Sequence, residues 1–362
     1  MLDLRDAVAL SLLSGPIRFD IVGRITRSPL GPLLEDSGPP PESLAGITLA
    51  DVCHASGIAP PPARLLDEAE RALERGDRAG AQVVAWFDAL YPERLRAIAD
   101  PPPVLWIRGH PGVLSSPSVA IVGARAASAG ARHVATELGA DLAAAGLVVV
   151  SGMARGVDGA AHLGALSTGR TVAVLGCGVD VTYPPEHASL ARRIADGGAL
   201  VAEFPPGTSP QAHHFPLRNR IISGLSLGVV VVEAREDSGS LITARCALDQ
   251  GRDVMAVPGA VPGGRNRGAH ALLRDGARLV EGAADVLDEL GLARGGRWTA
   301  LAAPDPADRV LSALNPGEPT GIEELTERTG FQTASLLARL ASLEMAGLVS
   351  REPGGLFVRA GR

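Results

Sequence analysis

The chain has 362 residues, enough for two or three domains that each bury a hydrophobic core. Its 46% hydrophobic and 20% charged residues indicate a folded protein and exclude an intrinsically disordered one. It contains no run of 18 apolar residues, and its N-terminus carries acids where a signal peptide would be basic. We therefore expect a soluble, cytoplasmic protein with no membrane contact. Three scattered cysteines suit a reducing compartment and form neither a disulfide framework nor a metal site.

The distribution of charge limits the possible functions further. All 34 basic residues are arginine, which excludes a P-loop NTPase because its phosphate-binding loop requires a lysine. The net charge of −6 argues against indiscriminate binding to nucleic acids but allows a local basic groove. Four windows contain arginine but no acidic residue, and an anionic partner is expected there: 101–136, 159–179, 204–232 and 254–274.

In chain order, residues 1–82 form a helical N-terminal module whose function the sequence does not indicate. From about residue 118, short β-branched runs alternate with helical segments, as in "SVAIVGA", "LVVVSG" and "LGVVVVEA". This alternation predicts a doubly wound α/β domain with a parallel sheet, over 83–291. Residues 292–304 read as a linker and 305–362 as a winged helix, with three helices followed by two strands.

The winged helix offers little basic surface. Its candidate recognition helix, 332–346, exposes only Arg339 as a base. This favours a protein-docking or accessory role for 305–362, although a regulator that binds duplex DNA through this module remains an alternative.

Parallel α/β sheets bind ligands at the carboxyl ends of their strands, where helix N-termini favour anions. The segment "VAIVGARAASAG" is such a strand–loop–helix, but it lacks the spacing of a dinucleotide fingerprint. We expect Gly123 to be structural and Arg125 to contact an anion. Downstream, Ser238 and Ser240 lie at another strand-to-helix junction, where one hydroxyl can cap the helix and the other suits a phosphate or a ribose.

Asp158 and His162 in "SGMARGVDGAAH" stand four residues apart and would share a helix face. This spacing could create a metal or acid–base pair. The sequence favours instead an N-cap role for Asp158 and a packed position for His162.

These motifs, in this order, resemble the DprA/Smf family of DNA-processing proteins. The resemblance runs from about 91–109 to 272–282 and is carried by "VAIVGAR", "VVSGMARGVDGAAH", "TVAVLGCGVDVTYPPEH", "HFPLRNRIISGLS" and "VVVVEAREDSGSLITARCALDQGRDVMAVPG". It implies a non-enzymatic protein without a cofactor or metal, which binds single-stranded DNA and loads the RecA recombinase onto it during natural transformation. It also implies a homodimer.

The resemblance also assigns site residues. The family's G-S-R loop falls on Gly123, Ala124 and Arg125, where alanine replaces the usual serine. A basic residue ahead of the third strand falls on Arg170, although the fold alone would place Arg170 at the opposite edge of the sheet. His270 stands where the family usually has asparagine.

The family's R-N-R motif falls on Arg218, Asn219 and Arg220. The two arginines cannot share a helix face, so one could reach a phosphate while the other braces the fold. Arg220 is slightly favoured as the DNA contact. Aromatic residues are only 3% of the chain, which limits base stacking to candidates such as Phe215 and Tyr183 and predicts low sequence specificity.

One enzyme class remains an alternative. A nucleotide phosphoribohydrolase of the lysine-decarboxylase-like type shares this kind of sheet and carries a P-G-G-x-G-T-x-x-E loop. Residues 261–270, "VPGGRNRGAH", contain the P-G-G but neither the threonine nor the glutamate.

Overall fold

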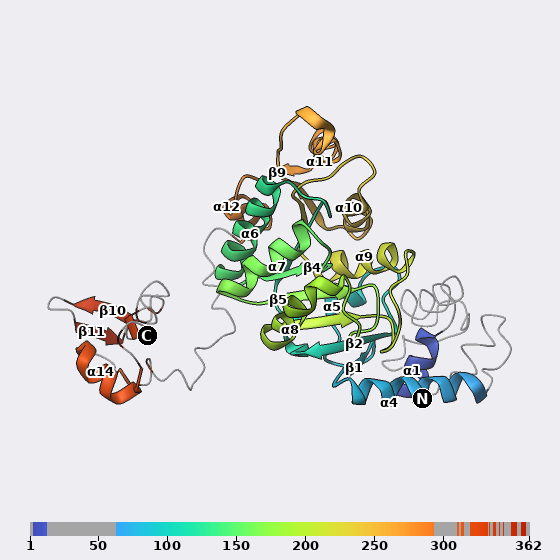
Figure 1. Cartoon of the computed structure of the whole chain (residues 1–362), viewed down its shortest axis with the longest axis horizontal. Coiled ribbons are helices and arrows are strands. Elements are labelled where there is room, and N and C mark those ends of the chain that lie inside the picture. Colours follow the sequence, from blue (N-terminus) through green and yellow to red (C-terminus); the bar gives the residue numbers. More distant parts are fainter. Residues whose placement is uncertain are drawn as a thin grey trace, which may run out of the picture. The chain divides into compact units, whose positions relative to one another are not determined.

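The computed structural model describes residues 3–12 and 63–292. In the C-terminal region it describes residues 310, 313–314, 319–331, 333, 336–337, 340, 343, 349–352 and 356–359. Residues 1–296 form one compact unit and residues 297–362 a second (Figure 1). No described helix is long and apolar enough to cross a bilayer.

The first unit is built on a nine-stranded sheet within the described residues, with the strand order β1-β2-β6-β5-β4-β3-β7-β8-β9. The strands from β6 to β9 in this order are parallel, whereas β2 pairs antiparallel with both β1 and β6. The strands are β1 (Gln82–Ala85), β2 (Val104–Gly109), β3 (Ser118–Val122), β4 (Val148–Ser151), β5 (Thr171–Leu175), β6 (Ala199–Ala202), β7 (Gly228–Val231), β8 (Asp253–Ala256) and β9 (Arg278–Leu279).

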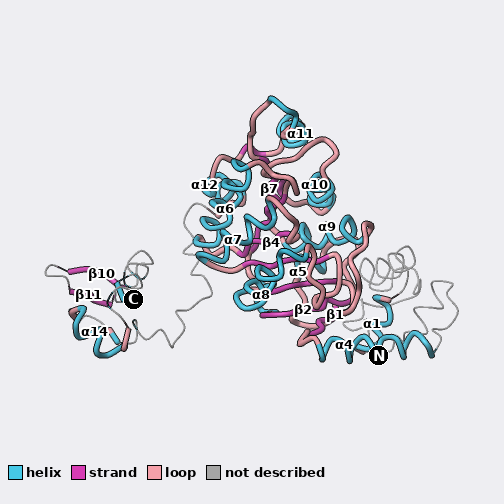
Figure 2. The backbone as a smooth tube through the Cα atoms, viewed as in Figure 1, coloured by secondary structure: helices cyan, strands magenta, loops and turns pink. Residues whose placement is uncertain are grey.

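Helices cover both faces of the sheet (Figure 2). Alternate residues of β3 point to opposite faces: Val119 and Ile121 join the core under α6, α7 and α12, and Ala120 and Val122 join the core under α9 and α10. The helices are α6 (Ala129–Ala144), α7 (Val157–Thr168), α8 (Ala188–Gly197), α9 (His214–Leu225), α10 (Gly239–Asp249), α11 (Arg267–Arg274) and α12 (Ala283–Glu289). The predicted doubly wound Rossmann-like sheet is therefore confirmed.

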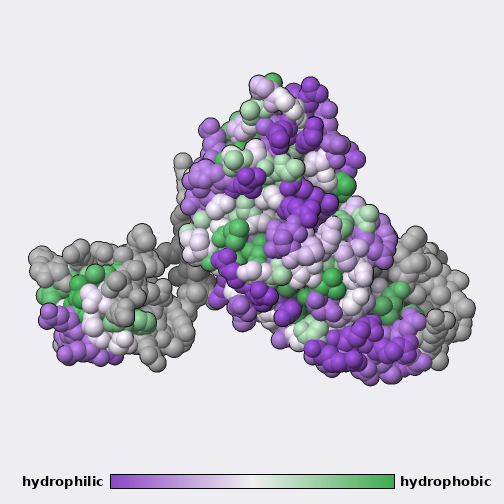
Figure 3. Space-filling model, in the orientation of Figure 1, coloured by the Kyte–Doolittle hydropathy of each residue, from purple (hydrophilic) through white to green (hydrophobic). Residues whose placement is uncertain are grey.

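The sequence did not predict β1 and β2, and the predicted boundary at 82/83 falls inside β1. Two N-terminal helices, α1 (Leu4–Ser11) and α4 (Ala63–Arg78), pack against each other and against β1. They belong to the same compact unit as the sheet. The outward surface of α4 is strongly hydrophilic (Figure 3).

The second unit is a winged-helix domain. Its described parts include α14 (Ile322–Thr329) and the antiparallel pair β10 (Val349–Glu352) and β11 (Leu356–Arg359). A small core around Leu325 and Phe357 joins these elements. Arg339 and residues 293–304 of the expected linker lie outside the described residues.

Candidate nucleic-acid interface

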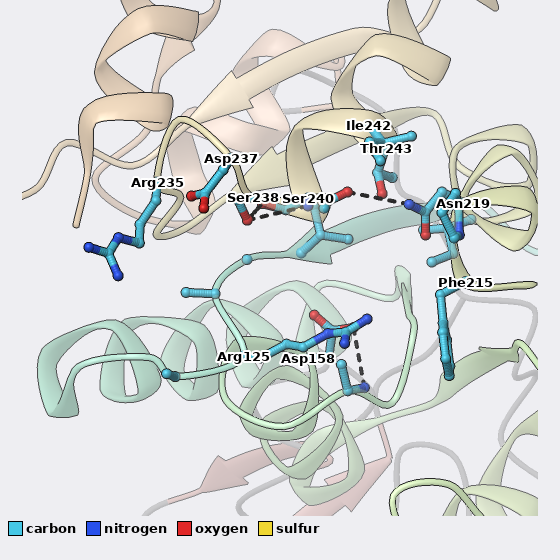
Figure 4. Close-up of a pocket in the computed structure, with 18 of the residues that line it drawn as sticks. Arg125, Asp158, Phe215, Asn219, Arg235, Asp237, Ser238, Ser240, Ile242 and Thr243 are labelled. Carbon is cyan, nitrogen blue, oxygen red and sulfur yellow. Dashed lines mark hydrogen bonds between the residues drawn. The ribbon is translucent and has the colours of Figure 1, made fainter. Parts of the chain in front are cut away.

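A cavity of about 700 Å³ opens at the carboxyl edge of the sheet. It lies at the topological switch point, where the chain leaves β3 toward β4 and later returns to the other side of β3 with β7. Crevices of this kind are the usual ligand sites of open α/β sheets. Loops after β3 and β7 and one end of α9 supply most of its lining, which includes Gly123, Ala124, Arg125, Asp158, Phe215, Arg218, Asn219, Glu233, Arg235, Ser238, Ser240 and Thr243 (Figure 4).

The loop after β3 is fixed by its backbone. The Ala124 N–H donates to the carbonyl oxygen of Glu233 at 2.7 Å, and the Ala124 carbonyl accepts from the Val157 N–H at 3.2 Å. A Cβ at Gly123 would lie 2.6 Å from Cγ2 of Val157, so only glycine allows β3 to approach α7 this closely. Gly123 and Ala124 therefore shape the cavity, and the missing serine hydroxyl at 124 removes no contact made by this backbone.

Arg125 extends from this loop into the cavity (Figure 4). Its Cζ lies 5.3 Å from the ring centroid of Phe215, within the range of a cation–π interaction. The ring of Phe215 in turn lies 5.3 Å from that of Tyr183. Among the described residues, the side chain of Arg125 makes no hydrogen bond or ion pair, so its guanidinium donors remain available to an anion beside two aromatic rings.

Arg218, on α9, also lines this cavity. It is 4% exposed, and its Nη1 donates to the carbonyl oxygen of Val174 at 2.7 Å. Its Nε has no partner among the described residues. Burial lowers the pKa of Arg218 to about 10, against the opposing effect of Asp158, so the side chain stays cationic at neutral pH.

Arg220, two residues further along α9, is directed elsewhere. It is 6% exposed and binds both carboxylate oxygens of Glu203, at 3.0 and 2.7 Å, as well as Oδ2 of Asp100 at 2.8 Å. Burial alone would lower the pKa of Arg220, but Glu203 and Asp100 raise it above its ordinary value. The preference for Arg220 as the DNA contact is therefore corrected: Arg220 braces the fold, and Arg218 faces the cavity.

Three further polar residues, Asn219, Ser238 and Ser240, line the cavity where α9 meets the start of α10. Nδ2 of Asn219 donates to the Gly239 carbonyl oxygen at 3.3 Å, which joins α9 to the start of α10. The hydroxyl oxygen of Ser238 caps α10 by accepting from the Ser240 N–H at 3.4 Å, and the two serine hydroxyls lie 2.7 Å apart. The predicted cap is confirmed, and the second hydroxyl lines the cavity.

Arg170, an expected site residue, and His270, at the family's asparagine position, lie away from the cavity. Arg170 is exposed and precedes β5, so it stands at the amino edge of the sheet and does not line the cavity. Its contact with DNA stays a prediction. His270 lies 3.0 Å from the carbonyl oxygen of Gly259 through Nε2 and is also absent from the lining.

The proposed acid–base pair is buried and structural. Asp158 lies in the first turn of α7, where Gly156 occupies the N-cap position, so the predicted capping role is wrong. Its Oδ2 accepts instead from the N–H groups of Gly152 and Ala154, at 3.1 and 3.4 Å, and burial raises its pKa. His162 is fully buried, as predicted, with Nδ1 2.7 Å from Oγ1 of Thr171. The described residues contain no group of three potential metal ligands.

Sequence reasoning missed four charged residues of the lining. Arg235, Asp237 and Glu233 follow β7 directly, and Arg265 lies 4.0 Å from a carboxylate oxygen of Glu233. The cavity is therefore not acid-free, because Glu233 and Asp237 follow directly after the acid-free window 204–232. Glu233, Arg235 and Asp237 could have been predicted, because residues that directly follow a buried parallel strand meet at the carboxyl edge of the sheet.

Comparison with known proteins identifies the family of this chain. Residues 82–291 match the family model of DNA recombination-mediator protein A, and residues 299–355 match that of the DprA winged helix domain. The chain belongs to the DprA/Smf family of DNA-processing proteins. It is 41% identical to Protein Smf of Escherichia coli over 285 residues, which is 75% of each chain, and 45% identical to DNA processing protein DprA of Streptococcus pneumoniae over 56% of this chain and 72% of that one.

Solved structures agree with this assignment. The X-ray structure of DprA from Streptococcus pneumoniae superimposes with a TM-score of 0.66 at 34% identity, covering 80% of this chain and 99% of that one. A DprA structure from Helicobacter pylori, described for its single-stranded DNA binding mode, matches with a TM-score of 0.53 at 28% identity, over 59% of this chain and 97% of that one.

Proposed function

We propose that this protein binds single-stranded DNA in the cavity at the carboxyl edge of its sheet, with little sequence specificity. The observation that carries the proposal is the position of Arg125, which lies over the ring of Phe215, lines the cavity and has no anionic partner among the residues that the structure describes. A phosphate can bind the guanidinium while a base stacks on an adjacent ring, which is how sequence-tolerant sites hold single strands.

Arg218 and Arg235 line the same cavity and add positive charge to that of Arg125. The acids of the lining are partly offset: Asp158 interacts with Arg218, and Glu233 accepts from the Ser128 N–H at 3.1 Å. Three or four phosphate contacts would make log K fall against log salt with a slope of roughly −2 to −3. Binding that does not respond to salt, or that strongly prefers one sequence, would contradict this site.

The bound strand is then delivered to a RecA recombinase during natural transformation, and the protein acts as a homodimer. Support for this role comes from the match to the DNA recombination-mediator protein A family and from the Helicobacter pylori relative, which is described for its single-stranded DNA binding mode. Faster assembly of RecA filaments on single strands in the presence of the protein is the expected result, and light scattering measures the mass of the dimer.

The protein is proposed not to be an enzyme. Asp158 and Glu203 are the buried acids that an enzyme would be expected to use. Asp158 accepts hydrogen bonds from backbone N–H groups, and Glu203 accepts from Arg220. We expect no hydrolysis of ATP or AMP after long incubation, measured by chromatography. Release of free base from AMP that disappears on changing Asp158 or Glu203 would favour the phosphoribohydrolase.

The site is tested by Arg125→Glu in a fluorescence-anisotropy titration with a labelled single strand. Loss of a charged contact costs about 1.5–3 kcal/mol, and charge reversal adds repulsion, so affinity should fall at least about tenfold. Arg339→Glu, or removal of 305–362, should change affinity little. Each variant must keep its melting temperature, and the reverse ranking would move the site to the winged helix.

A further inference from the structure

A second groove lies on the far side of the loop that joins β4 to α7. Its volume is about 540 Å³, and residues of α6, the first turns of α7 and the start of α8 line it. The residues that matter here are Arg132, Leu163, Glu186, His187 and Arg193. The cavity described above does not include any of them.

The groove carries uncompensated positive charge. Arg193 is exposed and has no hydrogen bond or ion pair among the described residues. Arg132 uses one nitrogen, Nη1, to donate to the Ala127 carbonyl oxygen at 2.6 Å. The acid of the lining, Glu186, is already bound by Arg155. The guanidiniums of Arg132 and Arg193 therefore line the groove, and no carboxylate of the described part of the chain pairs with either.

The groove continues the first cavity around the same loop. A small cavity shares Arg125, Tyr183 and Phe215 with the first one and is also lined by Arg155. Arg155 in turn holds Glu186 at the edge of the groove. The Arg155–Glu186 ion pair thus connects the small cavity with the groove, along a surface that belongs to one compact unit.

We propose that this groove is a second phosphate-binding site, which holds the continuation of the single strand bound in the first cavity. This inference rests on the proposed function. None of the described residues that line the groove is Phe, Tyr or Trp, so it would grip the sugar-phosphate backbone and leave the bases unstacked. The strand is favoured over an acidic peptide because the groove is continuous with the nucleic-acid site and presents a single exposed leucine, Leu163.

Two oligothymidylates, of about 6 and about 20 nucleotides, separate the two sites, because only the longer one can extend beyond the first cavity. We expect Arg193→Glu to weaken binding of the long oligonucleotide about tenfold and to reduce the magnitude of the slope of log K against log salt by about 1. Binding of the short oligonucleotide should not change. Arg192→Glu is the matched control, since Arg192 is an exposed neighbour on α8 that does not line the groove. Arg132→Gln serves as a second variant with the same expected direction.

The outcomes distinguish this site from the first one. Equal affinities of the Arg193→Glu and Arg192→Glu proteins, with Arg125→Glu still defective, would overturn the groove and leave the proposed function intact. An equal loss on both oligonucleotides would also overturn it, because the change would then act through the first cavity. Failure of the unaltered protein to bind either oligonucleotide would overturn the proposed function itself.

Discussion

Two buried guanidiniums on α9, two residues apart in the chain, have opposite surroundings. Arg220 binds Glu203 through two nitrogens and Asp100 through a third contact. Arg218 donates to one backbone carbonyl, lies near the buried Asp158 and lines the cavity. The same side chain at similar burial is neutralised in one region and only partly compensated in the other.

This difference in the number of anionic partners distinguishes an arginine held in the fold from one that we propose binds the strand. A phosphate that approached Arg220 would have to displace a two-pronged carboxylate contact from a buried site, which is costly. A phosphate that approaches Arg218 meets a guanidinium whose Nε has no partner among the described residues. Among the described acids that line the cavity, Asp158 alone contributes to the pKa shift of Arg218. Their spacing on the helix turns the two side chains away from each other, so one short motif places one arginine in an ion pair and the other at the cavity.

The largest effect is expected on the Arg220 side. Arg220→Met removes both guanidinium contacts from the buried, charged Glu203, which should lower the free energy of unfolding by about 3–5 kcal/mol. Urea denaturation measures this change. The affinity for single-stranded DNA should equal that of the unaltered protein when it is measured without urea, at a temperature at which the variant is folded.

A double variant provides the control. Arg220→Met combined with Glu203→Leu removes the buried carboxylate together with its guanidinium and should recover most of the lost stability. A single variant that keeps full stability, or that binds DNA poorly while folded, would show that the two arginines do not divide their roles in this way.

The fold was largely predictable because its central strands are short apolar runs bounded by glycine and separated by helical segments. The exceptions were β1 and β2. Their sequences, "QVVA" and "VLWIRG", are not followed by the helix pattern that identifies the other strands, and they pair antiparallel at the edge of the sheet. Short apolar runs of this kind cannot be assigned from periodicity alone.

The site was predictable only in part. Arg125 follows a strand, so its position at the carboxyl edge could be derived from the order of elements. Which of Arg218 and Arg220 faces the cavity depends on Glu203 and Asp100, which are distant in sequence from the cavity-lining loops and meet Arg220 only in the folded chain. The acids after β7 were overlooked because charge windows measure distance along the chain and not in space.

A smaller change in stability is expected when the pH is lowered, through His162, which lies near Arg218. Burial, assisted by His187 and Arg218, lowers the pKa of His162 from 6.5 to about 3. Because the folded pKa is the lower one, His162 contributes stability fully above pH 6.5, and this contribution is lost as pH falls toward 3. The loss should reach about 2 kcal/mol by pH 5, since one pKa unit corresponds to 1.36 kcal/mol.

His162→Asn isolates this contribution, because an asparagine amide can donate to Oγ1 of Thr171 in place of Nδ1 but does not titrate. Urea denaturation of both proteins at several pH values gives the comparison. Parallel stability curves between pH 7 and 5 would show that His162 does not titrate on unfolding in the expected way.

The smallest effect, and the most selective, comes from Gly152→Ala. An added Cβ at residue 152 would lie 1.8 Å from Nη1 of Arg218, so the guanidinium would have to leave the Val174 carbonyl and its place at the cavity. The atoms displaced belong to the end of a flexible side chain, and the cost in stability should therefore be small. Single-strand affinity should fall about tenfold, or about 1.4 kcal/mol, which is the scale of one hydrogen bond to a charged group.

Gly130→Ala is the matched control, because a Cβ at residue 130 meets no atom within 4 Å. Arg218→Met should reproduce the loss of affinity seen with Gly152→Ala, and the two changes combined should cost no more than either alone, since both remove the same contact. Additive losses would mean that Gly152 acts on the strand independently of Arg218. Unchanged affinity in the Gly152→Ala protein would remove Arg218 from the binding site, and the contrast between the two sides of α9 would then be one of packing alone.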